Sequence, residues 1–280
     1  MSYRWWSCGR TDTGRLRRVN EDAYLNLDNI GLWIVADGMG GHAKGDIASR
    51  LIVDSFKGVA KPQSADAFAE LVRDRLSLAN ERMRHQLPGL QPGEIMGSTV
   101  VAFLVYKREW RCLWAGDSRA YLMRDGRLTQ ITRDHSVAQD MVERGEIRQE
   151  QAAYHPFANR ITRAIGTQNE LLLDEYRSHL RDGDTVLLCS DGLNKEVDDE
   201  EVEEILAQYD CDDASRELVD LTLERGARDN VTVAVIKFEE TTAVKSRLPD
   251  ATAVNYGLTG QCTQLTGEFR PEIRGCLNHG

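Results

Sequence analysis

The chain has 280 residues, of which 41% are hydrophobic, enough for the core of one large domain or two modest ones. Its net charge of −10 at pH 7 argues against a nucleic-acid-binding protein that relies on diffuse basic attraction. No apolar run approaches the roughly 18–20 residues that cross a bilayer, and the first residues lack the apolar core of a signal peptide. The six cysteines have no Cys-x-x-Cys spacing, so we expect a cytoplasmic protein without disulfides.

Strand-like and helical segments follow one another along the first half of the chain. Apolar runs predict strands, and apolar residues at helical spacing predict helices. The expected strands span 4–10, 22–27, 31–36, 98–106, 110–115, 119–124 and 127–132. The expected helices form one pair, at about 43–59 and 65–86.

The second half begins with a polar segment at 134–165 that we expect to be helical. The strands and helices expected after it lie near 171–179, 184–190, 199–208, 213–226 and 231–238. The acidic run 198–204 is typical of a helix N-terminus, where the helix dipole favours negative charge. Runs of strands with paired helices predict an α+β fold, a layered α-β-β-α sandwich of two antiparallel sheets flanked by helix pairs. This domain is expected at 1–240, and the aperiodic polar stretch 241–280 predicts a disordered tail.

Asp37 stands where a buried strand gives way to a glycine-rich segment. The apolar run 32–36 leads into Asp37–His42, which holds three glycines within four residues. A carboxylate at the end of such a strand is held rigidly, and the glycines let the backbone approach a ligand closely. His42 follows as a candidate proton donor. Taken alone, the segment is equally typical of a glycine-rich hairpin turn.

A second copy of this pattern favours a functional site. The run 186–190 leads into Asp191-Gly192, whereas the Asp-Gly pairs at 125–126 and 182–183 lie between charged residues and are typical of solvated turns. Further acids stand at the ends of other expected strands: Glu21, Asp22, Asp117 and Asp229.

Carboxylates gathered at one sheet edge repel one another unless cations neutralise them. Ligation by oxygen alone, without a cluster of cysteine or histidine, indicates Mg²⁺ or Mn²⁺ rather than zinc. Two such ions, about 3.5–4 Å apart, form the clamp that hydrolyses phosphate esters with a metal-bound hydroxide. Carboxylates and metals alone do not choose the ester, so a nuclease remains an alternative at this point.

Seven short motifs occur in a fixed order along the chain. They are Arg17–Asp22, Asp37–His42, Gly97–Thr99, Gly116–Arg119, Asp134–Ser136, Ser190–Leu193 and Asp229-Asn230. In this order they resemble the PPM family, the metal-dependent type 2C protein serine/threonine phosphatases, in its bacterial form. The resemblance covers about residues 7–238. One motif alone would be weak, whereas the ordered set is specific and disfavours the nuclease.

The resemblance implies ligands for two Mn²⁺ or Mg²⁺ ions and for a weaker third. Asp37 would bridge two ions, and Asp191 and Asp229 would complete the first. The other metal residues that the resemblance implies are Gly38 through its carbonyl, Asp22 and Glu21 at the second ion, and Asp117 with Asp191 at the third. A non-catalytic relative that binds phosphoprotein or metal would be favoured by loss of a core ligand, and these acids are all present.

The resemblance also implies roles away from the metals. Arg17 would grip the substrate phosphate with its planar guanidinium, and an idealised strand would place it on the same face as Glu21. His42 occupies the position of the proposed general acid, and 134–165 that of a small mobile flap. The substrates implied are phosphoserine and phosphothreonine proteins, with a bacterial Ser/Thr kinase as the opposing enzyme. We expect a monomer with no nucleic-acid partner and no membrane span.

Overall fold

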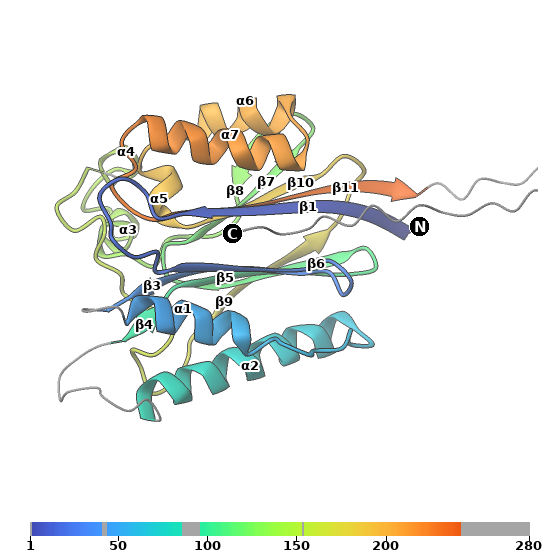
Figure 1. Cartoon of the computed structure of the whole chain (residues 1–280), viewed down its shortest axis with the longest axis horizontal. Coiled ribbons are helices and arrows are strands. Elements are labelled where there is room, and N and C mark those ends of the chain that lie inside the picture. Colours follow the sequence, from blue (N-terminus) through green and yellow to red (C-terminus); the bar gives the residue numbers. More distant parts are fainter. Residues whose placement is uncertain (1, 41–43, 86–95, 153, 242–280) are drawn as a thin grey trace, which may run out of the picture. The chain divides into compact units, whose positions relative to one another are not determined.

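Two antiparallel sheets lie face to face between two pairs of helices, as Figure 1 shows. The computed structural model describes residues 2–40, 44–85, 96–152 and 154–241. The predicted α+β sandwich is confirmed. The predicted tail lies outside the described residues from 242 onward, and the last strand ends at Thr241.

One sheet joins the two ends of the described chain. In spatial order its strands are β1 (Ser2–Asp12), β11 (Val231–Thr241), β10 (Thr185–Cys189), β7 (Arg119–Arg124) and β8 (Arg127–Gln130). Helices α6 (Asp199–Gln208) and α7 (Cys211–Glu224) cover its outer face. Asp198 caps α6 as the acidic run predicts, because its carboxylate accepts from the Glu201 N–H at 3.0 Å.

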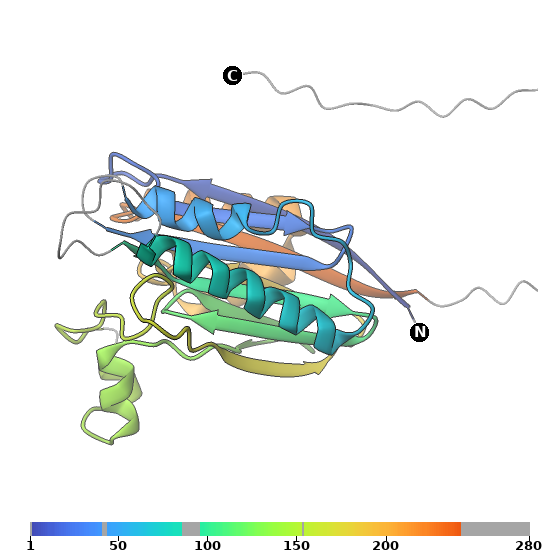
Figure 2. The same cartoon turned by 90° about the horizontal axis from the view of Figure 1, so that it is seen from below.

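The second sheet comes mainly from the first half of the chain. In spatial order its strands are β2 (Asp22–Leu27), β3 (Leu32–Met39), β5 (Val100–Tyr106), β6 (Glu109–Ala115) and β9 (Asp174–His179), and the short β4 (Gly97–Ser98) also pairs with β3. Helices α1 (Gly45–Asp54) and α2 (Ala65–His85) cover its outer face, which Figure 2 shows from below. Among the described residues, no helix is both long and apolar enough to cross a membrane.

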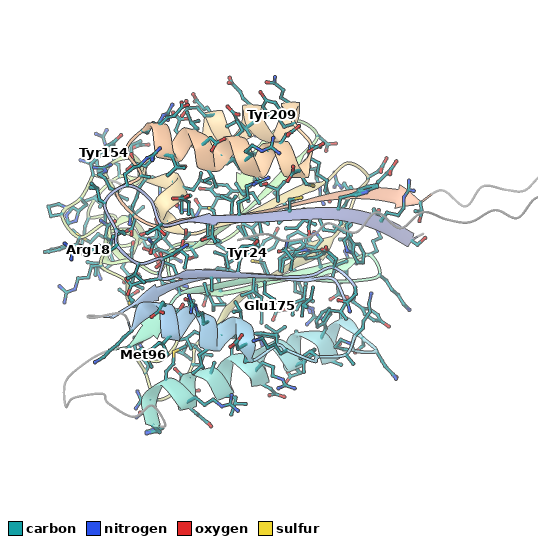
Figure 3. All side chains as sticks on the ribbon, in the orientation of Figure 1. Arg18, Tyr24, Met96, Tyr154, Glu175 and Tyr209 are labelled. Carbon is teal, nitrogen blue, oxygen red and sulfur yellow. The ribbon has the colours of Figure 1, made fainter. Side chains whose placement is uncertain are left out.

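The core has three layers, and this explains why the first five residues of β3, 32–36, are apolar without interruption. Leu32 and Ile34 pack toward the helices, whereas Trp33 packs toward the opposite sheet. Successive side chains of a strand point to opposite faces, so a strand buried on both faces loses the alternation of polar and apolar residues. Between the sheets Trp33 meets Phe238 of β11, with ring centroids 6.0 Å apart, and Tyr24 lies in the same layer (Figure 3).

The prediction that 134–165 is helical is wrong for most of the segment. Among its described residues, only α3 (Val137–Glu143) and α4 (Gln149–Ala152) are α-helical. The chain folds back instead, since the Val137 N–H donates to the Arg160 carbonyl at 2.9 Å and the Thr162 N–H to the His135 carbonyl at 2.8 Å. These cross-segment bonds use backbone groups that a continuous helix would need. In Figure 2 the α3 segment stands off from one end of the sheets.

Two smaller predictions also need correction. The single strand expected at 98–106 is divided at Thr99, whose N–H and hydroxyl bond the backbone of Asp37 at 2.8 and 3.1 Å. A short helix that the sequence does not predict, α5 (Asp191–Asn194), begins directly after β10.

Candidate active site

The predicted acids meet at one end of the sandwich. Asp22, the first residue of β2, lies directly opposite Asp37 near the end of β3. Like charges facing each other across a strand pair are destabilising, so this placement is one that packing alone would not favour. The pKa of Asp37 is raised well above its ordinary value, first by burial and then by the charges of four other acids, which are Asp22, Asp191, Asp117 and Asp229.

Asp22 ties the two sheets together. Its Oδ2 accepts hydrogen bonds from the hydroxyls of Ser190 and Thr232, each at 2.7 Å. Thr232 belongs to β11 of the opposite sheet, and Ser190 directly follows β10 of that sheet. Asp22 Oδ1 is buried without a partner. Burial raises the pKa of Asp22 to about 7 in spite of the two hydroxyls. The sequence analysis missed Ser190 and Thr232 as contributors, because only the fold brings them to Asp22.

Gly38 lies where three backbone segments cross. Its N–H donates to the Glu21 carbonyl at 3.0 Å, and a Cβ built on it would lie 1.9 Å from the Gly45 carbonyl oxygen. The position therefore excludes any side chain. The Glu21 carboxylate accepts from the Gly45 N–H at 3.2 Å, at the positive end of α1. Burial raises the pKa of Glu21, whereas this N–H and Arg17 oppose the shift.

Asp117 lies in the turn between β6 and β7. The preceding Gly116 has φ +117° and packs against Thr99, where a Cβ would approach to 2.5 Å. The Gly116 N–H donates to Nδ1 of the buried His135 at 3.1 Å, and the other ring nitrogen lies 3.2 Å from Asp174. His135 thus braces this turn, in agreement with the structural role that such a buried histidine usually has.

The carboxylate of Asp117 itself is short of partners. Its Oδ1 is buried without a hydrogen bond. Burial, followed by the charge of Asp191, raises the pKa of Asp117 to about 8. A buried carboxylate in this condition is stabilised by any cation that reaches it.

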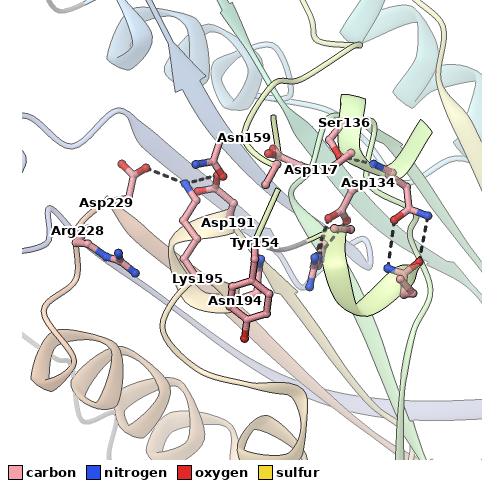
Figure 4. A pocket seen from close by; sticks show the side chains of 16 residues that line it. Asp117, Asp134, Ser136, Tyr154, Asn159, Asp191, Asn194, Lys195, Arg228 and Asp229 are labelled. Atoms are coloured by element: carbon pink, nitrogen blue, oxygen red, sulfur yellow. Dashed lines mark hydrogen bonds and ion pairs between the residues drawn. The ribbon is translucent and has the colours of Figure 1, made fainter. Parts of the chain in front are cut away.

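Lys195, which the sequence pattern does not predict as a site residue, contacts both Asp191 and Asp229. Lys195 Nζ lies 2.5 Å from Asp191 Oδ2 and 3.1 Å from Asp229 Oδ2 (Figure 4). Burial lowers the pKa of Lys195, but the two carboxylates outweigh it and leave this pKa above its ordinary value. Burial likewise raises the pKa of Asp229, whereas Lys195 and Arg17 bring it below the ordinary value.

Arg17 reaches the site by a route other than the predicted one. Residues 13–21 form no strand, so the argument that Arg17 and Glu21 share a strand face is wrong. The loop nevertheless places the guanidinium 2.8 Å from Asp229 Oδ1. His42 lies outside the described residues, and its role as proton donor stays a prediction.

The donor set suits hard divalent cations. Three of its carboxylates, those of Asp22, Asp117 and Asp191, each hold one buried oxygen without a hydrogen bond. As the side chains are placed, no three acids, cysteines or histidines of the described ranges surround one point closely enough to hold an ion. Lys195 and Arg17 contact the acids there instead. Oxygen donors with raised pKa values and unpaired lone pairs fit Mg²⁺ or Mn²⁺.

A cavity of about 650 Å³ opens beside these acids. Asp117, Asp191 and Asp229 form one part of its wall, and the α3–α4 segment forms another with Tyr154 and Asn159 (Figure 4). Tyr154 is 90% exposed. Figure 3 shows Tyr154 and Arg18 at the same end of the molecule. A ligand in this cavity therefore reaches Asp117, Asp191 and Asp229.

The chain was compared with known proteins. Residues 15–229, which include every predicted site residue, match the family model of protein phosphatase 2C. The serine/threonine phosphatase Stp of Listeria monocytogenes is 34% identical over 236 residues, which cover 81% of this chain and 94% of Stp. The phosphatase PstP of Mycobacterium tuberculosis is 36% identical over 226 residues, 81% of this chain and 43% of the longer PstP.

Solved structures agree with the sequence relatives. PppA, described as a key regulatory component of T6SS in Pseudomonas aeruginosa, superposes with a TM-score of 0.78 at 43% identity, covering 84% of this chain and 98% of PppA. The catalytic domain of PstP, solved in complex with two manganese ions, superposes with a TM-score of 0.77 at 32% identity, covering 85% and 100%. This chain belongs to the protein phosphatase 2C family, the PPM family of metal-dependent protein serine/threonine phosphatases, in its bacterial form.

Proposed function

We propose that the cluster around Asp37 is the catalytic metal centre of this phosphatase. The enzyme hydrolyses phosphoserine and phosphothreonine with Mn²⁺ or Mg²⁺ as cofactor. The observation that carries the assignment is the gathering of four further carboxylates around Asp37, three of which hold a buried oxygen without a hydrogen-bond partner. Such a cluster costs folding stability by itself, and bound divalent cations remove that cost.

Each acid has a proposed place in the centre. Asp37 would help to hold both ions, and Asp191 and Asp229 would hold the first. The residues proposed for the remaining positions are Asp22 and Glu21 at the second ion, the Gly38 carbonyl beside Asp37, and Asp117 with Asp191 at a weaker third ion. The crossing of backbone segments at Gly38 supports its part, since this position has no room for a side chain of its own beside the carbonyl.

The chemistry that two bound ions supply is Lewis-acid activation of a water molecule and neutralisation of the phosphate charge. Arg17 binds the phosphate of the substrate through its guanidinium, which already stands at the centre in contact with Asp229. His42 donates the proton that the departing serine or threonine oxygen needs. The segment 134–165, as the proposed flap, holds the peptide that carries the phosphoresidue in the cavity beside the acids.

Hydrolysis of a phosphothreonine peptide tests the assignment. We expect turnover with Mn²⁺, loss of turnover after exhaustive chelation and its return when Mn²⁺ is added back. Asp37→Asn should lower turnover by at least about a thousandfold, because the carboxylate that would hold both ions is gone. Asp54→Asn is the matched control, since Asp54 is an exposed acid of α1 that pairs with Lys57. Full activity in the Asp37→Asn enzyme would overturn the assignment.

The physiological substrate is proposed to be a phosphoprotein of a bacterial Ser/Thr kinase pathway, with this enzyme acting as a cytoplasmic monomer. The 43% identity with PppA supports a kinase of a secretion-regulating system as the enzyme that it opposes. Phosphopeptide mass spectrometry of a deletion strain checks this. Phosphosites of such a system should rise on deletion and return to normal with wild-type enzyme but not with Asp37→Asn.

A further inference from the structure

Lys195 places a positive charge of the chain itself inside the carboxylate cluster. It follows the short helix α5, four residues after Asp191, so its stem folds back over the helix start. The ammonium touches Asp191 Oδ2 at 2.5 Å and Asp229 Oδ2 at 3.1 Å. Its side chain is only 24% exposed, and Figure 4 shows the ammonium between the two acids. Solvent therefore screens these contacts only in part.

The two acids differ in the oxygens that remain for another cation. Asp229 Oδ1 contacts Arg17 at 2.8 Å and accepts the Asn230 N–H at 3.0 Å, while Oδ2 faces Lys195. Both oxygens of Asp229 therefore already face a charged side chain. Asp191 Oδ1, in contrast, is buried without a hydrogen bond. A divalent ion could reach Asp191 directly, whereas at either oxygen of Asp229 it would meet the positive charge of Arg17 or Lys195.

We propose that Lys195 is an internal counter-ion of the metal centre, one that competes with the divalent cation for Asp229 and Asp191. The inference rests on the proposed function, because it takes these two acids as metal ligands. Before metal binds, the ammonium offsets the repulsion among the carboxylates and stabilises the fold. When metal binds, Lys195 withdraws from Asp229 into the cavity that it lines.

The side-chain chemistry of lysine suits this exchange. An ammonium is a compact charge on a flexible four-carbon stem, so it can leave one carboxylate without any change in the backbone. An ammonium and a divalent cation a few ångströms apart repel each other, and the repulsion is stronger in a partly buried site than in water. Lys195 thus lowers the affinity for metal and raises the stability of the metal-free enzyme, and both effects come from the same charge.

Two measurements on the full chain test the proposal, and neither uses turnover. Calorimetric titration with Mn²⁺ gives the affinity, and thermal unfolding in chelator gives the stability without metal. Lys195→Met keeps the stem and removes the charge, so we expect Mn²⁺ to bind on the order of tenfold more tightly. In chelator the same variant should unfold at a lower temperature than wild type. Lys195→Gln repeats both measurements in case Lys195→Met does not fold.

Two variants serve as matched controls. Lys195→Arg keeps the charge and should retain the wild-type affinity and stability. Lys57→Met removes one positive charge from an exposed position that pairs with Asp54 on the surface of α1, so it should change neither quantity.

Equal or weaker Mn²⁺ binding by the uncharged variants would overturn the proposal and would leave Lys195 as a group that merely orients Asp191. A gain in affinity in Lys195→Arg as large as that in Lys195→Met would also overturn it, since shape rather than charge would then be responsible. If wild-type enzyme bound no Mn²⁺, the metal centre of the proposed function would fail, and the competition with it. The first two outcomes leave that centre intact, so the failures are distinguishable.

Discussion

At the scale of single residues, the site depends on side chains that already contact another residue of the chain. Arg17 is the clearest case, because it contacts Asp229 at 2.8 Å although its proposed ligand is a phosphate. Its pKa is raised, since Asp229 and the nearby Glu21 and Asp37 outweigh the effect of burial. The guanidinium therefore stays charged at any physiological pH and is available to bind a dianionic phosphate.

Arg17→Ala should lower kcat/KM for a phosphothreonine peptide about 10- to 100-fold, mainly through KM, because hydrogen bonds to a charged partner are worth about 1.5–3 kcal/mol. Arg17→Lys should recover part of the loss, since a point charge replaces a planar fork. Steady-state kinetics measures both, with Arg4→Ala as an exposed arginine control that pairs with Glu239. A fall in Mn²⁺ affinity as large as that of Asp37→Asn would contradict the phosphate role.

We expect that a substitution of Asp117 lowers turnover without removing the two main metal ions. Its turn is braced by His135 and Thr99 rather than by the residues around Asp22, and it is proposed to hold only the weaker ion. Asp117→Asn should retain tight binding of two Mn²⁺ ions in calorimetric titration while turnover falls. Loss of all Mn²⁺ binding in this variant would show that Asp117 belongs to the main pair.

At the scale of elements, hydrogen bonds to the carboxylate of Asp22 connect the two sheets. Ser190 follows β10, and its hydroxyl donates to Asp22 across 168 residues of sequence and accepts the Thr232 N–H at 2.9 Å. All three groups are buried, so the hydroxyl cannot be replaced by water without rearrangement. This bond holds the start of β2 against the end of β10 and thus places Asp22 beside Asp191.

Ser190→Ala should therefore lower the free energy of unfolding by about 1–3 kcal/mol, because a buried N–H and a buried carboxylate each lose a partner. Ser7→Ala removes a serine–aspartate hydrogen bond of 2.5 Å on the exposed surface and serves as the control, expected to cost less than about 1 kcal/mol. Denaturant unfolding in chelator measures both. Equal costs would mean that the buried tie contributes nothing beyond an ordinary surface bond.

At the scale of the whole molecule, the acids make the stability of the fold depend on pH and on bound metal. Burial raises the pKa of Asp22 to about 7 and that of Asp117 to about 8, so folding keeps protons on groups that the unfolded chain releases near pH 4. The stability that these protons give is fully present at acidic pH below the unfolded value and is lost as pH rises through 7–8.

The melting temperature of the metal-free enzyme should fall between pH 6 and pH 9 for this reason. Saturating Mn²⁺ should raise it more at pH 9 than at pH 6, because fewer protons have to leave before the ion binds. The Asp22→Asn/Asp117→Asn double variant should flatten the dependence on pH in chelator. Scanning calorimetry across this range measures all three, and a melting temperature that rises with pH in the wild-type enzyme would contradict the assignment.

The sequence alone determined the layers of the fold and the acids of the site. Apolar runs of strand length and helices at 3.6-residue spacing are local signals, so β2, β3, α2 and β10 lie close to their expected positions. The acids could be identified because each stands at the end of such a strand. The segment 134–165 could not be predicted correctly, because its backbone bonds run between distant parts of the loop instead of along a helix.

Only the tertiary structure decided how the acids are neutralised. It brought Lys195 between Asp191 and Asp229, and it brought Arg17 to the site along a loop rather than a strand. It also placed Ser190 against Asp22. These contacts join residues that share no periodicity, and a buried charge takes whichever partner the packed backbone places within reach. Local pattern therefore identified the negative charges, and long-range packing selected the groups that compensate them.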